Sequence, residues 1–249
     1  MTMSKSHAGR VAVITGAAGA LGREFALALA AQGCDVAIAD ISAADHVVAE
    51  IEALGQRGYS EVCDLSDPGQ IESFVSATLD KFGRCDILVN NAAYMPVIPF
   101  AELGLDQLRR FQAINVEAAF LLAKLLTPGM AERGYGRIVQ IASSTTGTPM
   151  PGFLAYITTK MAGIGLTRSL AAEFGGRGIL CNALSPGLTL TPESRKNLPA
   201  ELFESVCERQ LIKRNELPSD LVGALLFLTS EGCGFVSGQT INCDGGVQF

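Results

Sequence analysis

The sequence contains no tryptophan, only 2 histidines and no closely spaced pair of cysteines. His7 and His46 are too few for a histidine-rich metal site or for a serine–histidine–aspartate catalytic triad. The 7 cysteines are odd in number and scattered, which favours reduced thiols over disulfides or metal ligands. We therefore expect no bound metal ion.

Clusters of basic residues and long apolar runs are also missing. The net charge is −6, and no group of lysines and arginines suggests binding to nucleic acid or to an anionic membrane. The uncharged stretches are shorter than a membrane span and are interrupted by glycine or proline. Residues 1–7 lack the apolar core of a signal peptide. We expect a cytoplasmic protein without a nucleic-acid or membrane partner.

The pattern that is present indicates one α/β domain spanning residues 1–249. Short β-branched runs alternate with longer amphipathic stretches, and 48% of the residues are hydrophobic. This alternation predicts a Rossmann-type, doubly wound fold: a seven-stranded parallel sheet with helices on both faces, in three layers. The expected strands are residues 10–15, 35–40, 58–63, 87–90, 137–142, 179–184 and 240–243, and the expected helices lie near 20–32, 43–54, 68–82, 104–132, 154–175 and 218–229.

Two features mark where these elements end. Glycines 33, 55, 83 and 178 follow expected helices, where a left-handed residue commonly stops the helix. Residues 188–216 interrupt the alternation with Pro192, Pro199 and one short expected helix. Because ligand sites of such sheets lie beyond the carboxyl ends of the strands, we interpret 188–216 as an insertion that covers a substrate.

A glycine-rich turn follows the first expected strand. Residues 15–22 read Thr-Gly-Ala-Ala-Gly-Ala-Leu-Gly, in which glycines let the backbone approach a pyrophosphate at a helix N-terminus. An ordinary strand–helix turn is the alternative for this motif alone. Asp40 ends the second strand, where a carboxylate can bind ribose hydroxyls and repel a 2′-phosphate, and neither 17–21 nor Ile41 supplies a compensating cation. We predict NAD rather than NADP, with a turn or helix-cap role as the alternative for Asp40.

Tyr156 and Lys160 are four residues apart and share one face of an expected helix. A free tyrosine has a pKa of about 10, which a neighbouring ammonium and a positive nicotinamide ring would lower. Ser143, directly after an expected strand, can donate a hydrogen bond to a substrate oxygen. Taken singly, each residue has a structural alternative: a buried aromatic, a solvated helix charge or a cap.

Together these motifs resemble the short-chain dehydrogenase/reductase family in its compact single-domain form. The resemblance covers nearly the whole chain, and further matching segments are Asp64-Leu65, Asn90-Asn91-Ala92-Ala93, Asn115, Pro186-Gly187 and Asp244-Gly245-Gly246. Ala20 stands where the middle glycine of the turn is usual, and Ala93 replaces a glycine. Because position 20 requires a backbone φ that alanine tolerates, we expect cofactor binding to survive.

The resemblance implies roles for individual residues. Asn115 would hold a water of a proton relay behind Lys160, and Ser143, Tyr156 and Lys160 would complete a catalytic tetrad. The predicted NAD contacts are Gly16, Gly19, Leu21, Asp40, Ile41, Asp64, Leu65, Asn91, Ala92, Tyr156, Lys160, Pro186, Gly187, Thr189 and Thr191. Within this set Thr189 would offer its backbone to the carboxamide and Thr191 its hydroxyl to the phosphates. Turn chemistry at strand ends is the alternative for Asp64, Asn90 and Asn91.

The expected substrate wall comes from residues 94–97, 145–153 and 188–198 and is largely apolar, although Arg195 and Lys196 could swing in. The predicted substrate contacts are Tyr94, Ser143, Thr145, Met150, Tyr156 and Leu188. We therefore expect a hydrophobic secondary alcohol or ketone, aryl or cyclic. Residues 82–91 and 98–100 also resemble the NAD-dependent 1-phenylethanol dehydrogenase branch.

Two other functions stay open. A 3-oxoacyl-carrier-protein reductase would want NADPH and a basic patch, whereas the adjacent pair Arg109-Arg110 is interpreted as solvated surface. A catalytically silent dinucleotide-binding sensor or scaffold is disfavoured by the intact tetrad.

The family commonly pairs the helices expected here at 104–132 and 154–175, so we predict a homotetramer. The apolar residues assigned to these paired faces are Phe111, Ile114, Phe120, Leu121, Ile164, Leu166 and Leu170.

Overall fold

The computed structural model describes residues 5–248. Its seven strands form one parallel sheet in the order β3-β2-β1-β4-β5-β6-β7, which confirms the predicted fold class. The strands are β1 (Val11–Thr15), β2 (Asp35–Asp40), β3 (Gly58–Val62), β4 (Ile87–Asn90), β5 (Gly136–Ile141), β6 (Ile179–Pro186) and β7 (Thr240–Cys243). The expected strand bounds differ from these by at most two residues.

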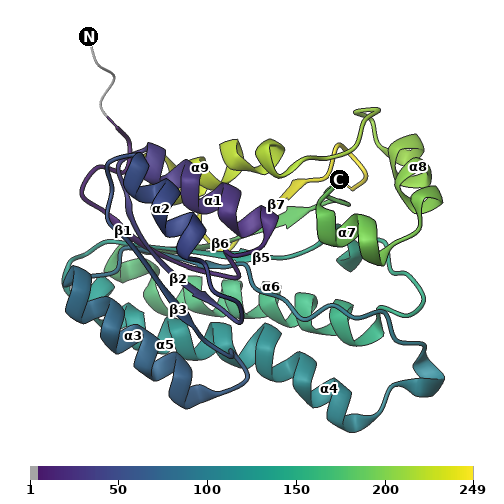
Figure 1. The fold of residues 1–249 in the computed structure, drawn as a ribbon, viewed down its shortest axis with the longest axis horizontal. Coiled ribbons are helices and arrows are strands. Elements are labelled where there is room, and N and C mark those ends of the chain that lie inside the picture. The colour runs from purple at the N-terminus through teal and green to yellow at the C-terminus, as the bar shows by residue number, and fades with distance from the viewer. Residues whose placement is uncertain (1–4, 249) are drawn as a thin grey trace.

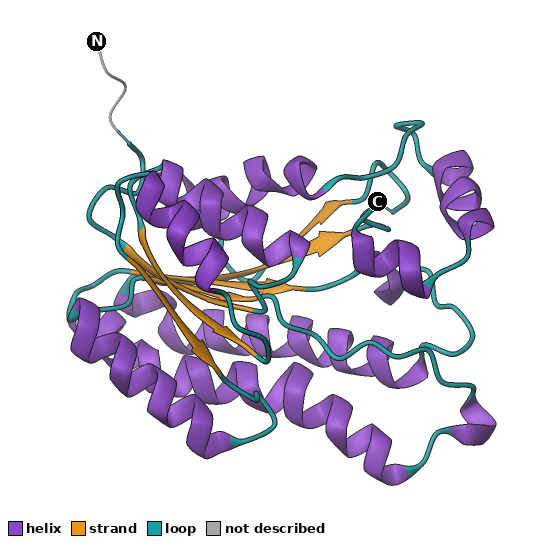
Figure 2. Cartoon of the chain, in the orientation of Figure 1, coloured by secondary structure: helices purple, strands orange, loops and turns teal. Residues whose placement is uncertain are grey.

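Helices cover both faces of the sheet (Figures 1 and 2). The helices above the sheet in this view are α1 (Ala20–Ala31), α2 (Asp45–Ala53) and α9 (Val222–Thr229), and those below it are α3 (Pro68–Phe82), α4 (Leu105–Gln112), α5 (Ala118–Glu132) and α6 (Leu154–Phe174). The pleat of β1 sends Ala12 and Ile14 into the upper core and Val11 and Val13 into the lower one. Both cores are apolar, which holds the three layers together.

Local sequence signals explain several helix ends. Asp67 caps α3 by accepting hydrogen bonds from the backbone N–H groups of Gly69 and Gln70, and Pro68 occupies the first helical turn. Gly83 follows α3 with φ of 75°, a left-handed conformation that ends the helix. Gly33, Gly55 and Gly178 also have positive φ beyond their helices, as expected.

Two segments differ from the sequence-based expectation. The helix expected near 104–132 is interrupted by a π-helical turn, Ala113–Glu117, between α4 and α5. The insertion 188–216 contains two helices rather than one, α7 (Pro192–Asn197) and α8 (Ala200–Arg209). Proline in the first turn of α7 and Pro199 at the N-cap of α8 divide this segment into two short helices.

The region from α4 to α5 is long and apolar enough to cross a membrane by length and composition, and 44% of its most apolar window is buried. Its buried residues Leu122, Leu126 and Met130 pack in the lower core beneath the strands. We therefore interpret it as a core helix.

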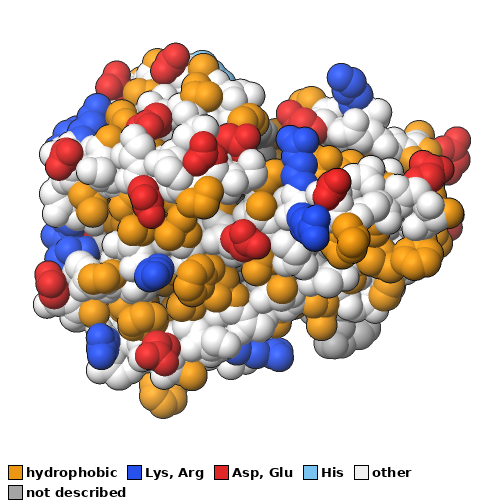
Figure 3. All heavy atoms as spheres, turned by 90° about the horizontal axis from the view of Figure 1, so that it is seen from below, with side chains coloured by type: hydrophobic (Ala, Val, Ile, Leu, Met, Phe, Trp, Pro, Cys, Tyr) orange, Lys and Arg blue, Asp and Glu red, His pale blue; other side chains and the backbone are white. Residues whose placement is uncertain are grey.

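The face seen from below (Figure 3) carries lysine and arginine interspersed with aspartate and glutamate, together with scattered hydrophobic side chains.

Two of the residues assigned to a subunit surface lie elsewhere. Phe111 is 1% exposed and Ile164 is 9% exposed, because both pack in the protein core. Phe120 is 52% exposed on α5 and remains available for contact with another subunit. The predicted oligomer therefore depends on fewer apolar residues than the sequence suggested.

Candidate active site

A cavity of about 730 Å³ opens at the carboxyl ends of the central strands. The strand order reverses between β1 and β4, and parallel sheets of this kind bind ligands at that point. All predicted cofactor and substrate residues line this cavity. Asn115, the remaining predicted catalytic residue, is buried behind it.

One end of the cavity is formed by the glycine-rich turn. Gly16 has φ of 71°, and a Cβ there would lie 2.8 Å from Cα of Ala92, so only glycine fits. Among the described residues, no side chain caps the N-terminus of α1 at Gly19, and no acidic residue lies in its first turn. Its backbone N–H groups can therefore bind an anion such as a pyrophosphate.

The two departures from the family's glycine pattern cause no backbone conflict. Every described residue with a positive φ is a glycine, so neither Ala20 nor Ala93 has a positive φ. Alanine is therefore compatible with the backbone at both positions, as expected for Ala20.

Gly22 lies where the helix after the glycine-rich turn packs closely against neighbouring atoms. A Cβ at Gly22 would lie 2.3 Å from the carbonyl oxygen of Gly16 and 2.7 Å from Nδ2 of Asn91. We predict that Gly22→Ala lowers the free energy of unfolding by about 1–3 kcal/mol, because the backbone of the turn must move. Thermal unfolding measures this effect.

Gly223→Ala, on α9, is the matched control because nothing lies within 4 Å of the Cβ it would add. It should leave stability unchanged or raise it by up to about 1 kcal/mol. Equal effects of the two substitutions would show that the contact at Gly22 is unimportant.

Asp40 lies at the end of the cavity formed by the glycine-rich turn and is only 8% exposed. Its two carboxylate oxygens accept hydrogen bonds from the backbone N–H groups of Ala18, at 2.8 Å, and Ser42, at 2.9 Å. The turn role considered as an alternative is therefore present. A carboxylate has about four acceptor positions, so it can still bind two hydroxyl groups.

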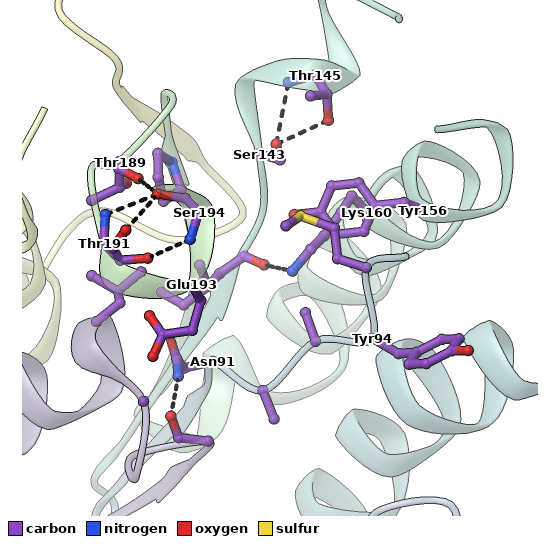
Figure 4. Close-up of a pocket in the computed structure, with 18 of the residues that line it drawn as sticks. Asn91, Tyr94, Ser143, Thr145, Tyr156, Lys160, Thr189, Thr191, Glu193 and Ser194 are labelled. Carbon is purple, nitrogen blue, oxygen red and sulfur yellow. Dashed lines mark hydrogen bonds between the residues drawn. The ribbon is translucent and has the colours of Figure 1, made fainter. Parts of the chain in front are cut away.

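The predicted reacting groups meet at the other end of the cavity (Figure 4). Tyr156 and Lys160 extend from α6 toward Ser143, and the Lys160 Nζ lies 5.5 Å from the centre of the Tyr156 ring. Nζ also donates to the carbonyl oxygen of Ile141 at 2.6 Å. Strand β5 therefore holds the lysine beside the tyrosine.

Ser143 has a hydrogen bonding pattern suited to donation. Its Oγ accepts hydrogen bonds from Thr145, from the backbone N–H at 3.2 Å and from the hydroxyl at 2.9 Å. Because both contacts use Oγ as the acceptor, its own hydrogen stays available for another oxygen in the cavity.

Burial dominates the acid–base properties of the pair. It raises the pKa of Tyr156 to about 12, although the Ser143 hydroxyl acts in the opposite direction. Burial also lowers the pKa of Lys160 to about 8. The ammonium of Lys160 was expected to lower the pKa of Tyr156. With the chain's own groups the pKa is raised instead, because removing the phenol from water has the larger effect.

Asn115 uses its side chain to join two elements. Its Oδ1 accepts from the backbone N–H of Tyr94 at 2.7 Å, and its Nδ2 donates to the Tyr94 carbonyl at 3.0 Å and to Oγ1 of Thr159 at 2.9 Å. Both amide hydrogens are thus engaged within the protein. Any contact of Asn115 with a relay water would therefore use one of its oxygens, Oδ1 or the backbone carbonyl, and not its amide hydrogens.

Several predicted cofactor contacts already take part in local hydrogen bonds. Thr191 caps α7 by accepting from the backbone N–H of Ser194 at 3.0 Å, and the Thr189 carbonyl accepts from the Ser194 hydroxyl at 2.8 Å. Asp64 accepts from both the N–H and the hydroxyl of Ser66, and Asn91 Nδ2 donates to the Gly16 carbonyl at 3.0 Å. The turn chemistry foreseen for Asp64 and Asn91 is present beside their place in the cavity.

The substrate end differs in two respects from the largely apolar wall that was expected, with Arg195 and Lys196 able to swing in. Tyr94 touches the cavity, but its ring packs against Phe111 at 4.8 Å and points away from Ser143 (Figure 4). Arg195 and Lys196 do not line the cavity, whereas Glu193 and Arg209 of the insertion do.

Arg110, interpreted from sequence as solvated surface, is exposed and also lines the cavity, with its guanidinium 4.9 Å from the centre of the Tyr94 ring. Further lining residues that the sequence analysis did not single out include Leu202 and Val206. Their spacing on the amphipathic helix α8 was the available signal.

Comparison with known proteins agrees with this geometry. Residues 16–248 match a family model described as enoyl-(acyl carrier protein) reductase. The chain is 33% identical to the 7alpha-hydroxysteroid dehydrogenase of Escherichia coli K12 over 240 residues, which cover 96% of this chain and 94% of the relative. It is also 33% identical to the 3-oxoacyl-[acyl-carrier-protein] reductase of Synechocystis sp. PCC 6803, with 96% of both chains covered.

Comparison with a solved structure also agrees with this fold. The 3-oxoacyl (acyl-carrier-protein) reductase of Agrobacterium tumefaciens C58, crystallised with NADP bound, superimposes with a TM-score of 0.90 at 31% identity, covering 98% of this chain and 96% of that one. The relatives act on different substrates and one binds NADP, so the NAD preference and the 1-phenylethanol branch stay predictions. The chain belongs to the short-chain dehydrogenase/reductase family of oxidoreductases, which bind a nicotinamide dinucleotide.

Proposed function

We propose that this protein is an NAD(H)-dependent oxidoreductase that interconverts a hydrophobic secondary alcohol, aryl or cyclic, and its ketone. One observation carries the proposal: a single cavity joins the uncapped N-terminus of α1 and Asp40 at one end to Ser143, Tyr156 and Lys160 at the other. In this proposal residues 1–249 act as one catalytic domain, and 188–216 cover the substrate.

The chain's own groups would manage the proton. Ser143 donates its free hydrogen to the substrate oxygen and orients it toward the Tyr156 hydroxyl. In oxidation Tyr156 takes the proton of the substrate hydroxyl, and in reduction it returns a proton to the carbonyl oxygen. Lys160, held by Ile141, keeps a cation beside the ring while the tyrosinate forms.

The residues present fit a nicotinamide dinucleotide. A Cβ at Gly19 would meet only the Gly16 carbonyl, at 3.6 Å, so its cavity side is open to a pyrophosphate. Lys160 would hold the nicotinamide ribose, and Gly187 and Thr189 would border the carboxamide. When bound, the dinucleotide accepts or supplies the hydride, and its oxidised form adds a positive charge that favours tyrosinate.

The proposed substrate class rests on the apolar side chains near Tyr156. Met150, Phe153, Leu188 and Leu198 line this end of the cavity, and Phe153 packs edge-on to Tyr156 with ring centres 6.1 Å apart. Burial of an aryl or cyclic group against them would supply most of the binding free energy.

Purified protein should be tested with a panel of secondary alcohols and ketones, with NAD⁺ and NADP⁺ side by side, by following reduced-coenzyme absorbance. We expect turnover with aryl and cyclic substrates and a higher kcat/KM with NAD. A tenfold preference for NADP⁺ would refute the coenzyme assignment. Binding of NADH without turnover of any substrate would favour the silent sensor.

The second candidate is a 3-oxoacyl-carrier-protein reductase, which the Synechocystis relative favours. The carrier protein would require a basic surface, but Arg109 pairs with Asp106 at 3.1 Å and Arg110 stacks on Tyr94. Faster reduction of an acyl-carrier-protein thioester than of small ketones would select this candidate.

We also propose a homotetramer in the cytoplasm. The exposed Phe120 of α5 and the partly buried Leu166 of α6 support contact between subunits. Light scattering at micromolar concentration should give the mass of four chains, and a monomer would contradict this assembly.

A further inference from the structure

A buried carboxylate lies where the insertion rejoins the fold. Glu216 is 5% exposed, although it belongs to a polar segment between α8 and α9. Ionised side chains are rarely buried without a partner because desolvation is costly. Its role was not visible in the sequence, and it does not belong to the predicted tetrad or cofactor set.

Glu216 contacts the first residues of the same insertion. Its Oε2 accepts a hydrogen bond from the backbone N–H of Gly187 at 3.0 Å, and its Oε1 accepts from the hydroxyl of Thr189 at 2.6 Å. Its backbone carbonyl accepts from the N–H of Leu190 at 2.7 Å, next to an isolated parallel bridge between Thr189 and Glu216. One residue at the end of the insertion therefore holds Thr189 and Leu190 at its beginning and Gly187 directly before it.

The backbone opposite the carboxylate is shaped for this contact. A Cβ at Gly187 would lie 2.9 Å from Oε2 of Glu216 and 3.1 Å from Cα of Asp244. Glycine at position 187 therefore lets the carboxylate approach the backbone closely. The same stretch, Gly187 to Thr189, lines the cavity on its other side.

We propose that Glu216 is a positioning residue: it clasps the two ends of the 188–216 insertion and thereby holds Gly187 and Thr189 in place at the nicotinamide end of the cavity. This inference rests on the proposed function only where its test measures coenzyme binding. Glu216 touches no reacting atom in this arrangement. It acts through the backbone that borders the dinucleotide.

The charge of Glu216 is not required for the clasp. Burial raises its pKa to about 7, the carboxylates of Asp220 and Asp244 act in the same direction, and the contacts with Thr189 and Gly187 oppose them. Asp220 is itself paired with Arg214 at 2.6 Å. When Glu216 is protonated, its O–H can donate to the Thr189 oxygen while its carbonyl still accepts from Gly187. Glutamine offers the same two contacts, so it should replace glutamate.

The test compares Glu216→Leu, Glu216→Gln and Thr189→Val. Glu204, exposed on α8 and outside the cavity, provides the matched controls Glu204→Leu and Glu204→Gln. The first readout is hydrogen–deuterium exchange of residues 186–191 in the coenzyme-free protein. We expect exchange about tenfold faster in Glu216→Leu, several-fold faster in Thr189→Val, and unchanged in Glu216→Gln and both controls.

The second readout is the NADH dissociation constant, with KM and kcat where a substrate is known. We expect Glu216→Leu to raise the dissociation constant about tenfold and the coenzyme KM more than it lowers kcat, while Glu216→Gln restores both. Should Glu216→Leu fail to fold, Thr189→Val, which keeps the side-chain shape, decides the result in the same two assays.

Outcomes separate the clasp from the proposed function. Unchanged exchange in residues 186–191 for both Glu216→Leu and Thr189→Val would overturn the clasp. Faster exchange with an unchanged NADH dissociation constant would overturn its link to the coenzyme. Wild-type protein that binds neither coenzyme would contradict the proposed function, and the exchange experiment would still decide the clasp.

Discussion

Replacing Tyr156 with phenylalanine is expected to lower kcat about 1000-fold, because it removes the only atom that exchanges a proton with the substrate oxygen in the proposed mechanism. Tyr156 is 7% exposed and its ring packs edge-on to Phe153, and phenylalanine keeps that packing. Stability and the NADH dissociation constant should therefore change little. Steady-state rates, thermal unfolding and coenzyme fluorescence measure the three quantities.

The pH dependence gives this prediction a second readout. Burial raises the pKa of Tyr156 to about 12, so the tyrosinate fraction grows with pH, whereas Lys160, whose pKa burial lowers to about 8, keeps its cation only below that pH. The rate of alcohol oxidation by the wild type should therefore increase with pH up to about 8, and the small residual rate of Tyr156→Phe should lack this increase.

Tyr135→Phe is the matched control. The Tyr135 hydroxyl donates to the Thr229 carbonyl at 3.1 Å and lies outside the cavity, just before the start of β5, whereas the reacting groups lie beyond its carboxyl end. Its activity should equal that of the wild type. If Tyr156→Phe turns over substrate at the wild-type rate, the proposed proton transfer is wrong.

The fold could be predicted because its signals are local and repeated. Buried β-branched runs such as Val11–Thr15 and Ile87–Asn90 fix the strands, and Asp67 and Gly83 mark the two ends of α3. The interruption of the helix near Asn115 has no such local signal. It accompanies hydrogen bonds that Asn115 donates to the Tyr94 carbonyl and the Thr159 hydroxyl, which are 21 and 44 residues away.

The properties of the site also divide into those with a local sequence signal and those without one. The residues around the cavity could be predicted because the motifs lie at the ends of strands that meet at one edge of the sheet. The pKa of Tyr156 could not, because it depends on how completely the phenol is buried. Glu216 gave no signal either, since its importance comes from contact with Gly187, 29 residues earlier. Burial and long-range pairing are properties of the assembled fold.

Removing the negative charge of Asp40 and adding a positive charge at position 41 should reverse the proposed coenzyme preference. Asp40 is buried beside the cavity, and Ile41 is 65% exposed and lines it. Two unit charges about 6 Å apart interact by about 3 kcal/mol at an effective dielectric constant of 20, which corresponds to about 100-fold in affinity. Asp40→Asn removes the repulsion of a 2′-phosphate, and Ile41→Arg adds an attraction.

The double variant Asp40→Asn/Ile41→Arg should therefore raise the ratio of kcat/KM for NADP to that for NAD by at least about 100-fold. Asparagine is preferred to alanine because Asp40 also accepts from the N–H groups of Ala18 and Ser42, and its amide oxygen preserves one of these contacts. Asp45→Asn/Glu52→Gln is the control for net charge, since it also changes the charge by +2 and both residues lie on α2 outside the cavity. An unchanged ratio in the double variant would mean that the carboxylate of Asp40 serves the turn alone and that another part of the cavity selects the coenzyme.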